Sequence, residues 1–192
     1  MIAKPKQRRI LLVRHGSVAE RYRGVCYGQS DVELSDEGRR QTLALAEELS
    51  TLPITHLVHS GLTRARLLAE LIAERAAVTP VVAPALAEIN FGQWELRTWD
   101  EIYSEVGEKV AGLIHSPASF RAPLGETTFE LRDRVLAWHR ELPSEGLIVA
   151  VGHGGAFGVL RGALAGVPVT QWPSLIPQHG QWVELDETGR DV

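Results

Sequence analysis

Residues 11–17, LLVRHGS, place two basic side chains and a glycine directly after an apolar run. The run, Ile10 to Val13, is typical of a short strand that is buried on both faces. Arg14 offers paired donors and a permanent positive charge to an oxyanion, and a neutral nitrogen of His15 can attack phosphorus. The stretch therefore predicts an anion site built around a nucleophilic histidine.

Two later apolar segments, at 54–59 and 147–152, also end in groups that suit an oxyanion. Arg64 follows the first segment, and His153 and Gly154 follow the second. Ligands of an open α/β sheet bind outside the carboxyl ends of its strands, so we expect these groups to meet at one edge. Gly154 and the glycine after it would open a helix whose free N–H groups also favour an anion.

A leaving alkoxide needs a proton, so a carboxylic acid should stand near the nucleophile. Glu88 is the candidate, because it follows a third apolar stretch and has Phe91 and Trp94 close by in the sequence. Apolar surroundings of this kind would keep its carboxyl group protonated. Two other carboxylates are alternatives, Glu95 and Glu126.

The composition limits the classes of function. The chain has 192 residues, enough for one domain over 1–192, and a net charge of −4 with a pI near 6.0. This charge argues against nucleic-acid and membrane-surface partners. The single cysteine, Cys26, excludes an internal disulfide framework, and the apolar run at 10–13 is too short for a signal sequence or a membrane span. We expect a cytoplasmic protein.

The hydrophobic pattern alternates between strands and helices along the chain, which indicates an α/β sandwich with a largely parallel central sheet. The predicted strands are 10–13, 54–59, 80–86, 147–152 and an edge strand at 181–185. The predicted helices are 35–49 capped by Ser35, 65–76, 99–106, 109–114, a helix through Leu142 capped by Thr127 or Thr128, and 156–164. The segments 17–33 and 92–126 have loops whose conformation the pattern does not predict. The edge strand would allow a homodimer by pairing with a second copy.

Five other histidines are interpreted as structural or surface residues: His56, His59, His115, His139 and His179. His56 and His59 are three apart on a predicted strand and so face opposite sides, which makes them a poor metal pair. The carboxylate and histidine spacings do not favour a metal site.

Four motifs in order resemble the histidine phosphatase superfamily, in the branch of cofactor-dependent phosphoglycerate mutases and bacterial phosphatases. They are RHG at 14–16, SGLTRA at 60–65, L-x-E-x-x-x-G at 86–92 and GHGG at 152–155. The resemblance covers about residues 9–165 and implies a three-layer, phosphoglycerate mutase-like α/β sandwich that needs no metal or organic cofactor.

The resemblance also implies roles for individual residues. His15 would become phosphorylated, Arg14, Arg64 and His153 would bind the phosphoryl group, and Glu88 would donate the proton. A loop from Arg21 to Asp31 would cover the substrate, with Tyr27, Gly28 and Gly154 near it. The chain departs from the family pattern at three positions, where Arg21 replaces an asparagine, Leu68 a threonine and Leu96 a glycine.

We therefore expect a phosphomonoester hydrolase that works through a phosphohistidine and acts on a small phosphate ester. The stretch CYGQSDVELS at 26–35 resembles α-ribazole phosphatase-like proteins, which makes α-ribazole 5'-phosphate a candidate substrate. Two alternatives stay open: a phosphoglycerate mutase-type phosphomutase, and a catalytically silent protein that binds phosphate ligands.

Overall fold

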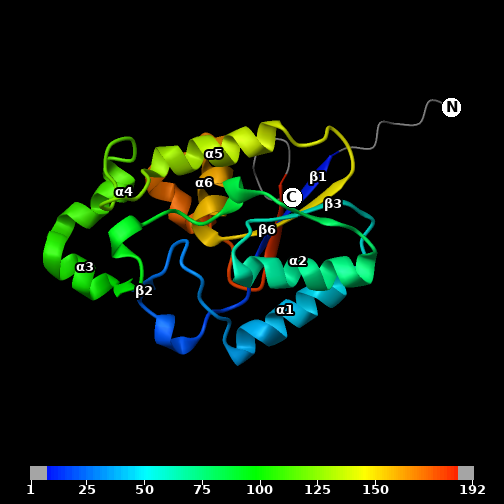
Figure 1. Ribbon diagram of the computed structural model, residues 1–192. Helices are drawn as coiled ribbons and strands as arrows, with labels where there is room; N and C mark the ends of the chain where they lie inside the picture. Colours follow the sequence, from blue (N-terminus) through cyan, green and yellow to red (C-terminus); the bar gives the residue numbers. More distant parts are fainter. Residues whose placement is uncertain (1–7, 186–192) are drawn as a thin grey trace.

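The computed structural model of the protein describes residues 8–185. Its central sheet has the strand order β4-β3-β6-β1-β7 (Figure 1). Strands β4, β3, β6 and β1 run parallel, and β7 runs antiparallel to β1. Their bounds are β1 Arg9–Arg14, β3 Ile54–His59, β4 Pro80–Val82, β6 Leu147–Gly152 and β7 Trp182–Leu185. The predicted fold class is confirmed.

Helices cover both faces of the sheet, which makes three layers (Figure 1). One face packs against α1 Asp36–Leu49 and α2 Thr63–Ala76, and the other packs against α5 Thr128–Arg140 and α6 Gly154–Leu164. Alternate residues of β1 divide between the two cores: Leu11 and Val13 pack toward α1 and α2, and Leu12 packs toward α5 and α6. Both faces of β1 are therefore buried, as the apolar run predicted.

Side-chain caps set where two of the helices begin. Ser35 Oγ accepts a hydrogen bond of 2.9 Å from the Gly38 N–H at the start of α1. Thr127, rather than Thr128, caps α5, through a capping box with Glu130. Helix α5 ends at Arg140, two residues before the predicted end. Leu142 precedes Pro143, and a residue before proline disfavours the helical conformation.

Two other predicted elements differ from the structure. The strand expected over 80–86 ends at Val82, because Pro84 has no N–H for a ladder and instead begins the 3₁₀ helix η2 Pro84–Leu86. The helix α3 Trp99–Val106 forms as predicted. The helix expected at 109–114 is instead divided between the 3₁₀ helix η4 Gly107–Ala111 and α4 Gly112–His115.

A second, two-stranded sheet joins the two segments that the sequence pattern left as loops. Strand β2 Val25–Cys26 pairs antiparallel with β5 Arg97–Thr98. Cys26, Trp94, Ile102 and Ala122 form a small third core beside this sheet. The remaining short helices are η1 Glu20–Tyr22, η3 Gly92–Trp94 and η5 Val169–Leu175. Strands of two residues have no periodicity, so the sequence could not predict this pairing.

Strand β7 lies at the sheet edge, as expected, and its pairing with a second copy stays a prediction. None of the helices within residues 8–185 combines the length and apolar character that a membrane crossing requires.

The turn after β1 packs directly on the first turn of α1. A Cβ atom added to Gly16 would lie 2.2 Å from the Gly38 carbonyl oxygen, and one added to Gly38 would lie 1.9 Å from the Ser17 carbonyl oxygen. Backbone cannot approach backbone this closely past a side chain. These two glycines therefore position the residues that follow β1.

Replacing Gly38 by alanine should destabilise the fold by about 1–3 kcal/mol, the usual cost of overpacking. Urea unfolding of Gly38→Ala measures this change in the free energy of unfolding. Arg39→Ala, at the exposed neighbouring position, is the control and should stay within about 0.5 kcal/mol of the parent. Equal midpoints for the two variants would show that the close approach is not required.

Candidate active site

The carboxyl ends of β1 and β6 bring two histidines together. The ring centroids of His15 and His153 lie 5.1 Å apart, and the two residues are 1% and 0% exposed. The Arg14 side chain lies beside them against Gly154, where an added Cβ atom would come within 2.9 Å of Arg14 Cζ. Arg64, on the first turn of α2 after β3, is 1% exposed. The structure thus brings together the groups that follow three separate strands.

The hydrogen bonding of His15 leaves one ring nitrogen free. Its Nδ1 lies 2.7 Å from the Gly16 carbonyl oxygen. A carbonyl only accepts, so Nδ1 carries the hydrogen and Nε2 keeps its lone pair. Burial, followed by the charge of Arg64, lowers the pKa of His15 well below its usual value of 6.5. Its imidazole is therefore neutral, and Nε2 is a nucleophile near neutral pH.

His153 is held by a side chain from the end of β3. Its Nε2 lies 2.7 Å from Ser60 Oγ, which also accepts a hydrogen bond of 3.3 Å from the Leu62 N–H. Burial, followed by the neighbouring His15, lowers the pKa of His153 well below 6.5. Its Nδ1 is buried without a hydrogen-bond partner among the described residues. Ser60 therefore orients the ring while a second nitrogen stays available.

Backbone carbonyls anchor both guanidinium groups. Arg14 Nη1 donates to the Pro177 carbonyl at 2.9 Å. Arg64 donates to the carbonyls of Ser30 at 2.8 Å and Gly28 at 2.6 Å. Within residues 8–185, the Nε atoms of both arginines are buried with no hydrogen-bond partner. Each guanidinium is thus fixed in place and keeps a donor for an anion.

The surroundings of Glu88 differ from those predicted. Its carboxylate accepts hydrogen bonds from the N–H groups of Gly155 at 3.0 Å and Ala156 at 3.2 Å, at the start of α6, and from Ile89 at 3.0 Å. Trp94 packs in the third core. The expectation that Trp94 lies beside the carboxyl group was wrong, because Trp94 is buried in the third core, whereas Phe91 does line the same cleft as Glu88.

The same contacts correct the expectation for Gly155, the second of the two glycines that open α6. Gly155 and Ala156 donate their N–H groups to Glu88, so the anion held by the helix N-terminus is a side chain of the protein. Gly154 instead provides the space in which Arg14 lies.

The two alternative acids take part in other contacts. Glu95 accepts hydrogen bonds from the Gln29 N–H at 2.9 Å and Ser30 Oγ at 2.5 Å, which fixes the loop that Arg64 contacts. Glu126 forms an ion pair with Arg134 at 2.7 Å, and Arg134 also donates to the Glu88 carbonyl at 2.9 Å. Both carboxylates hold the backbone around the site.

The loop residues expected near substrate divide into two groups. Tyr27 lies under Arg64, whose Cζ is 5.2 Å from the ring centroid. Gly28 has a φ of +38°, and its lack of a Cβ atom leaves room for the Glu95 carboxylate. Arg21, in contrast, is mostly exposed, and its described contacts are an ion pair with Glu33 and the ring of Tyr22. The structure does not bring Arg21 to the central groups, because Glu33 on the same loop binds it.

His179 was interpreted as structural or surface, yet it lies in the site. Its ring centroid is 5.2 Å from that of His15, and the next residue, Gly180, donates its N–H to the His15 carbonyl at 3.0 Å. Burial, followed by Arg14 and Arg64, lowers the pKa of His179 to about 4. No motif surrounds His179, so only the pairing of β7 with β1 places it here.

A cleft of about 360 Å³ opens at this edge of the sheet. Its lining includes Arg14, Tyr27, Gly28, Glu88 and Gly154. Cys26 also lines it, but burial, followed by Glu95, raises the pKa of the thiol to about 12, so it is no nucleophile. In the part of the chain that the structure describes, no three His, Cys, Asp or Glu side chains are grouped to hold a metal ion.

Known proteins are similar to this chain in sequence and in fold. A probable phosphoglycerate mutase GpmB of Escherichia fergusonii is 34% identical over 162 residues, which are 83% of this chain and 75% of that protein. A mycobacterial glucosyl-3-phosphoglycerate phosphatase is 29% identical, with a TM-score of 0.81 over 92% of this chain and 89% of that one. An α-ribazole phosphatase of Shigella flexneri is 24% identical, with a TM-score of 0.78 over 93% and 90% of the two chains, a likeness of fold.

The family model of the histidine phosphatase superfamily, branch 1, matches residues 10–191. This match includes every strand of the central sheet except the first residue of β1, together with all the groups gathered at its carboxyl edge. The chain belongs to the histidine phosphatase superfamily (branch 1).

Proposed function

We propose that the protein hydrolyses phosphomonoesters through a phosphohistidine on His15. The observation that carries the proposal is the free Nε2 of a neutral His15, whose ring centroid lies 5.1 Å from that of His153. Beside them lie the buried guanidinium group of Arg64 and the partly buried one of Arg14. A tetrahedral oxyanion matches the donors that Arg14, Arg64 and His153 offer. No cofactor is required by this chemistry.

In the first step, His15 Nε2 attacks phosphorus as the bond from phosphorus to the ester oxygen breaks. The charge spread over the phosphoryl oxygens is stabilised by Arg14, Arg64 and His153. Ser60 Oγ accepts a hydrogen bond from the Leu62 N–H and can donate its own hydroxyl hydrogen to His153 Nε2. The ring hydrogen then lies on Nδ1, which becomes a donor to the phosphoryl group.

Glu88 supplies the proton that the leaving oxygen needs. An incoming phosphate anion places negative charge beside the carboxylate, and such a pair favours holding one proton between them. In the second step the Glu88 carboxylate takes a proton from water, the water oxygen bonds to phosphorus, and the bond to His15 Nε2 breaks. Inorganic phosphate then leaves, and both residues return to their starting states.

α-Ribazole 5'-phosphate is one candidate substrate, on the resemblance of residues 26–35 to α-ribazole phosphatase-like proteins. A mutase is the alternative that the names of the GpmB relatives favour. The two activities differ in which acceptor takes the phosphoryl group from His15. A phosphatase passes it to water, and a mutase passes it to a hydroxyl group of glycerate, so the measured ratio of the two products distinguishes the activities. A panel with α-ribazole phosphate, sugar phosphates and phosphoglycerates tests the substrate.

Brief mixing with an aryl phosphate should leave phosphate bound to the protein in stoichiometric amount. A P–N bond is labile in acid and stable in base, so alkaline quenching should retain the label and acid quenching should lose it. His15→Ala should abolish labelling, whereas His56→Ala, at an exposed histidine, should label normally. A phosphoenzyme that persists in His15→Ala would rule out this nucleophile.

Removing the acid at Glu88 should affect esters according to their leaving group. Glu88→Gln should lower the rate with alkyl phosphates by about 10²–10⁴-fold, the usual contribution of a general acid. Hydrolysis of p-nitrophenyl phosphate should fall far less, because p-nitrophenolate leaves without a proton. Glu126→Gln is the control and should slow both esters to the same extent, since Glu126 acts through Arg134. Equal losses with the two esters in Glu88→Gln would remove Glu88 from this role.

The pH dependence follows from the lowered pKa of His15. The nucleophile loses activity when it gains a proton, and its pKa is below 6.5, so phosphoenzyme formation should show its acid limb well below pH 6.5. Single-turnover rates between pH 5 and 8 measure this limb. Two esters are compared whose phosphate groups differ in their second pKa. A limb that moves with the ester belongs to the ester, and a common limb centred at 6.5 would contradict a buried, neutral His15.

A further inference from the structure

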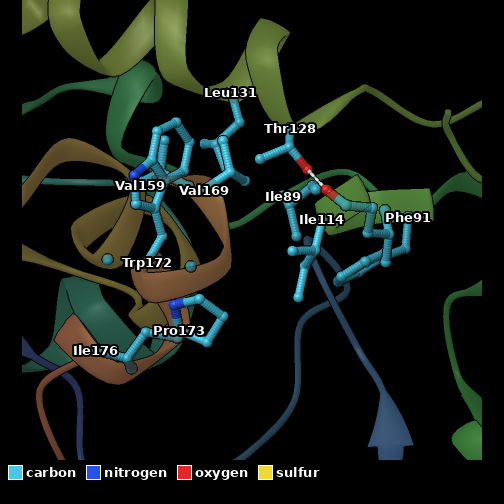
Figure 2. Close-up of a pocket in the computed structure, with 13 residues that line it drawn as sticks. Ile89, Phe91, Ile114, Thr128, Leu131, Val159, Val169, Trp172, Pro173 and Ile176 are labelled. Atoms are coloured by element: carbon cyan, nitrogen blue, oxygen red, sulfur yellow. Dashed lines mark hydrogen bonds between the residues drawn. The ribbon is translucent and has the colours of Figure 1, made fainter. Parts of the chain in front are cut away.

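A second cavity, of about 180 Å³, shares lining residues with the cleft at the sheet edge. Figure 2 shows this second cavity. It is lined by residues of α4, α5, α6 and η5 together with residues that follow Glu88. Figure 2 shows Leu131, Val159, Val169, Ile114 and Ile176 around it. We call this cavity the apolar pocket.

Its lining presents almost no polar surface to a ligand. Two of the lining side chains carry polar atoms, Thr128 and Trp172. Thr128 Oγ1 donates to the Leu113 carbonyl at 2.6 Å, shown dashed in Figure 2, and Trp172 Nε1 donates to the Val167 carbonyl at 3.0 Å. A sugar hydroxyl or a carboxylate placed here would lose its water without replacement, which costs about 1–3 kcal/mol or more per group.

The apolar pocket and the cleft share part of their walls. Ile89, Phe91, Gly155 and Ile176 line both. Ile89 follows Glu88 in the chain, and the Gly155 N–H holds the Glu88 carboxylate at 3.0 Å. The pocket therefore adjoins the proposed proton donor, on the side to which the leaving oxygen of an ester must turn.

The size of the pocket limits what can occupy it. A cavity of roughly 150 Å³ lined by aliphatic and aromatic side chains is large enough to hold benzene. The apolar pocket, at about 180 Å³, has room for one aromatic ring or a branched alkyl group of similar volume.

We infer that the apolar pocket binds the alcohol-derived part of the substrate, and that the preferred substrates are phosphomonoesters of alcohols with an apolar, ring-sized group. This inference rests on the proposed function for the position of the phosphoryl group at His15. It disfavours esters whose organic part is a glycerate or a sugar alone, since neither offers apolar surface for this pocket.

Binding of phosphonates tests the pocket without turnover. Benzylphosphonate and methylphosphonate carry the same anionic group on a non-hydrolysable bond and differ by one ring. Calorimetry should find benzylphosphonate at least tenfold tighter in the parent protein, since burial of a ring is worth several CH₂ groups at about 0.8 kcal/mol each. Equal affinities would overturn the inference.

Filling the pocket should remove this difference. Ile114 is partly buried on α4, and Ile114→Trp would place an indole in the cavity. The preference for benzylphosphonate should then fall to less than threefold, with methylphosphonate affinity unchanged within twofold. Val169→Phe fills the pocket from η5 and gives a second variant should the first fail to fold. The control is Leu43→Trp, at a site 51% exposed on α1, which should keep the full preference.

A hydrolysis assay separates the failure of the inference from the failure of the proposed function. Benzyl phosphate and glycerol 3-phosphate release alcohols from primary carbon atoms, and kcat/KM should favour benzyl phosphate at least tenfold. Equal kcat/KM values would overturn the pocket assignment while the phosphatase stands. Selective binding of benzylphosphonate without any phosphoenzyme would support the pocket and reject the phosphohistidine mechanism.

Discussion

Two guanidinium groups and three imidazole rings share a buried space at one edge of the sheet, and the site depends on how their charges are balanced. Arginine stays protonated, so the histidines must be neutral for the cluster to be stable. Burial is the first cause of the lowered pKa values of His15, His153 and His179, and the arginine charges lower each of them further. The same conditions that keep His15 nucleophilic also favour a doubly charged phosphoryl group.

Carboxylates around the site hold loop backbone in place, and this backbone in turn positions the arginine side chains. Glu95 fixes residues 28–30, whose carbonyls receive the Arg64 donors. Asp31 accepts the N–H and hydroxyl of Thr63 at 2.9 Å each and so caps α2 beside Arg64. Glu88 is held by the N-terminus of α6, the helix that His153 precedes. The precise position of Arg14, Arg64 and His153 thus depends on loops far apart in the chain.

The site divides into two parts with different physical demands. The polar part at the carboxyl edge of β1 and β6 carries charges and fixed donors, which suit a phosphoryl group common to all esters of this kind. The apolar pocket carries none, and its lining suits the organic group that we infer it binds. Relatives of similar fold bear names that refer to different phosphate esters. A division between shared chemistry and a separate organic-group pocket is a simple way for one fold to accept different alcohols.

The sequence by itself determined the largely parallel α/β sheet and the central groups at the strand ends, because buried parallel strands are continuous apolar runs and their carboxyl ends must share one edge. Only the tertiary structure decided the surroundings of Glu88, the ion pair that holds Arg21 to Glu33, and the place of His179 beside His15. These depend on β2 pairing with β5, on β7 pairing with β1, and on loop hydrogen bonds. Contacts of this kind join residues distant in the chain and produce no local periodicity, so no pattern in the sequence indicates them.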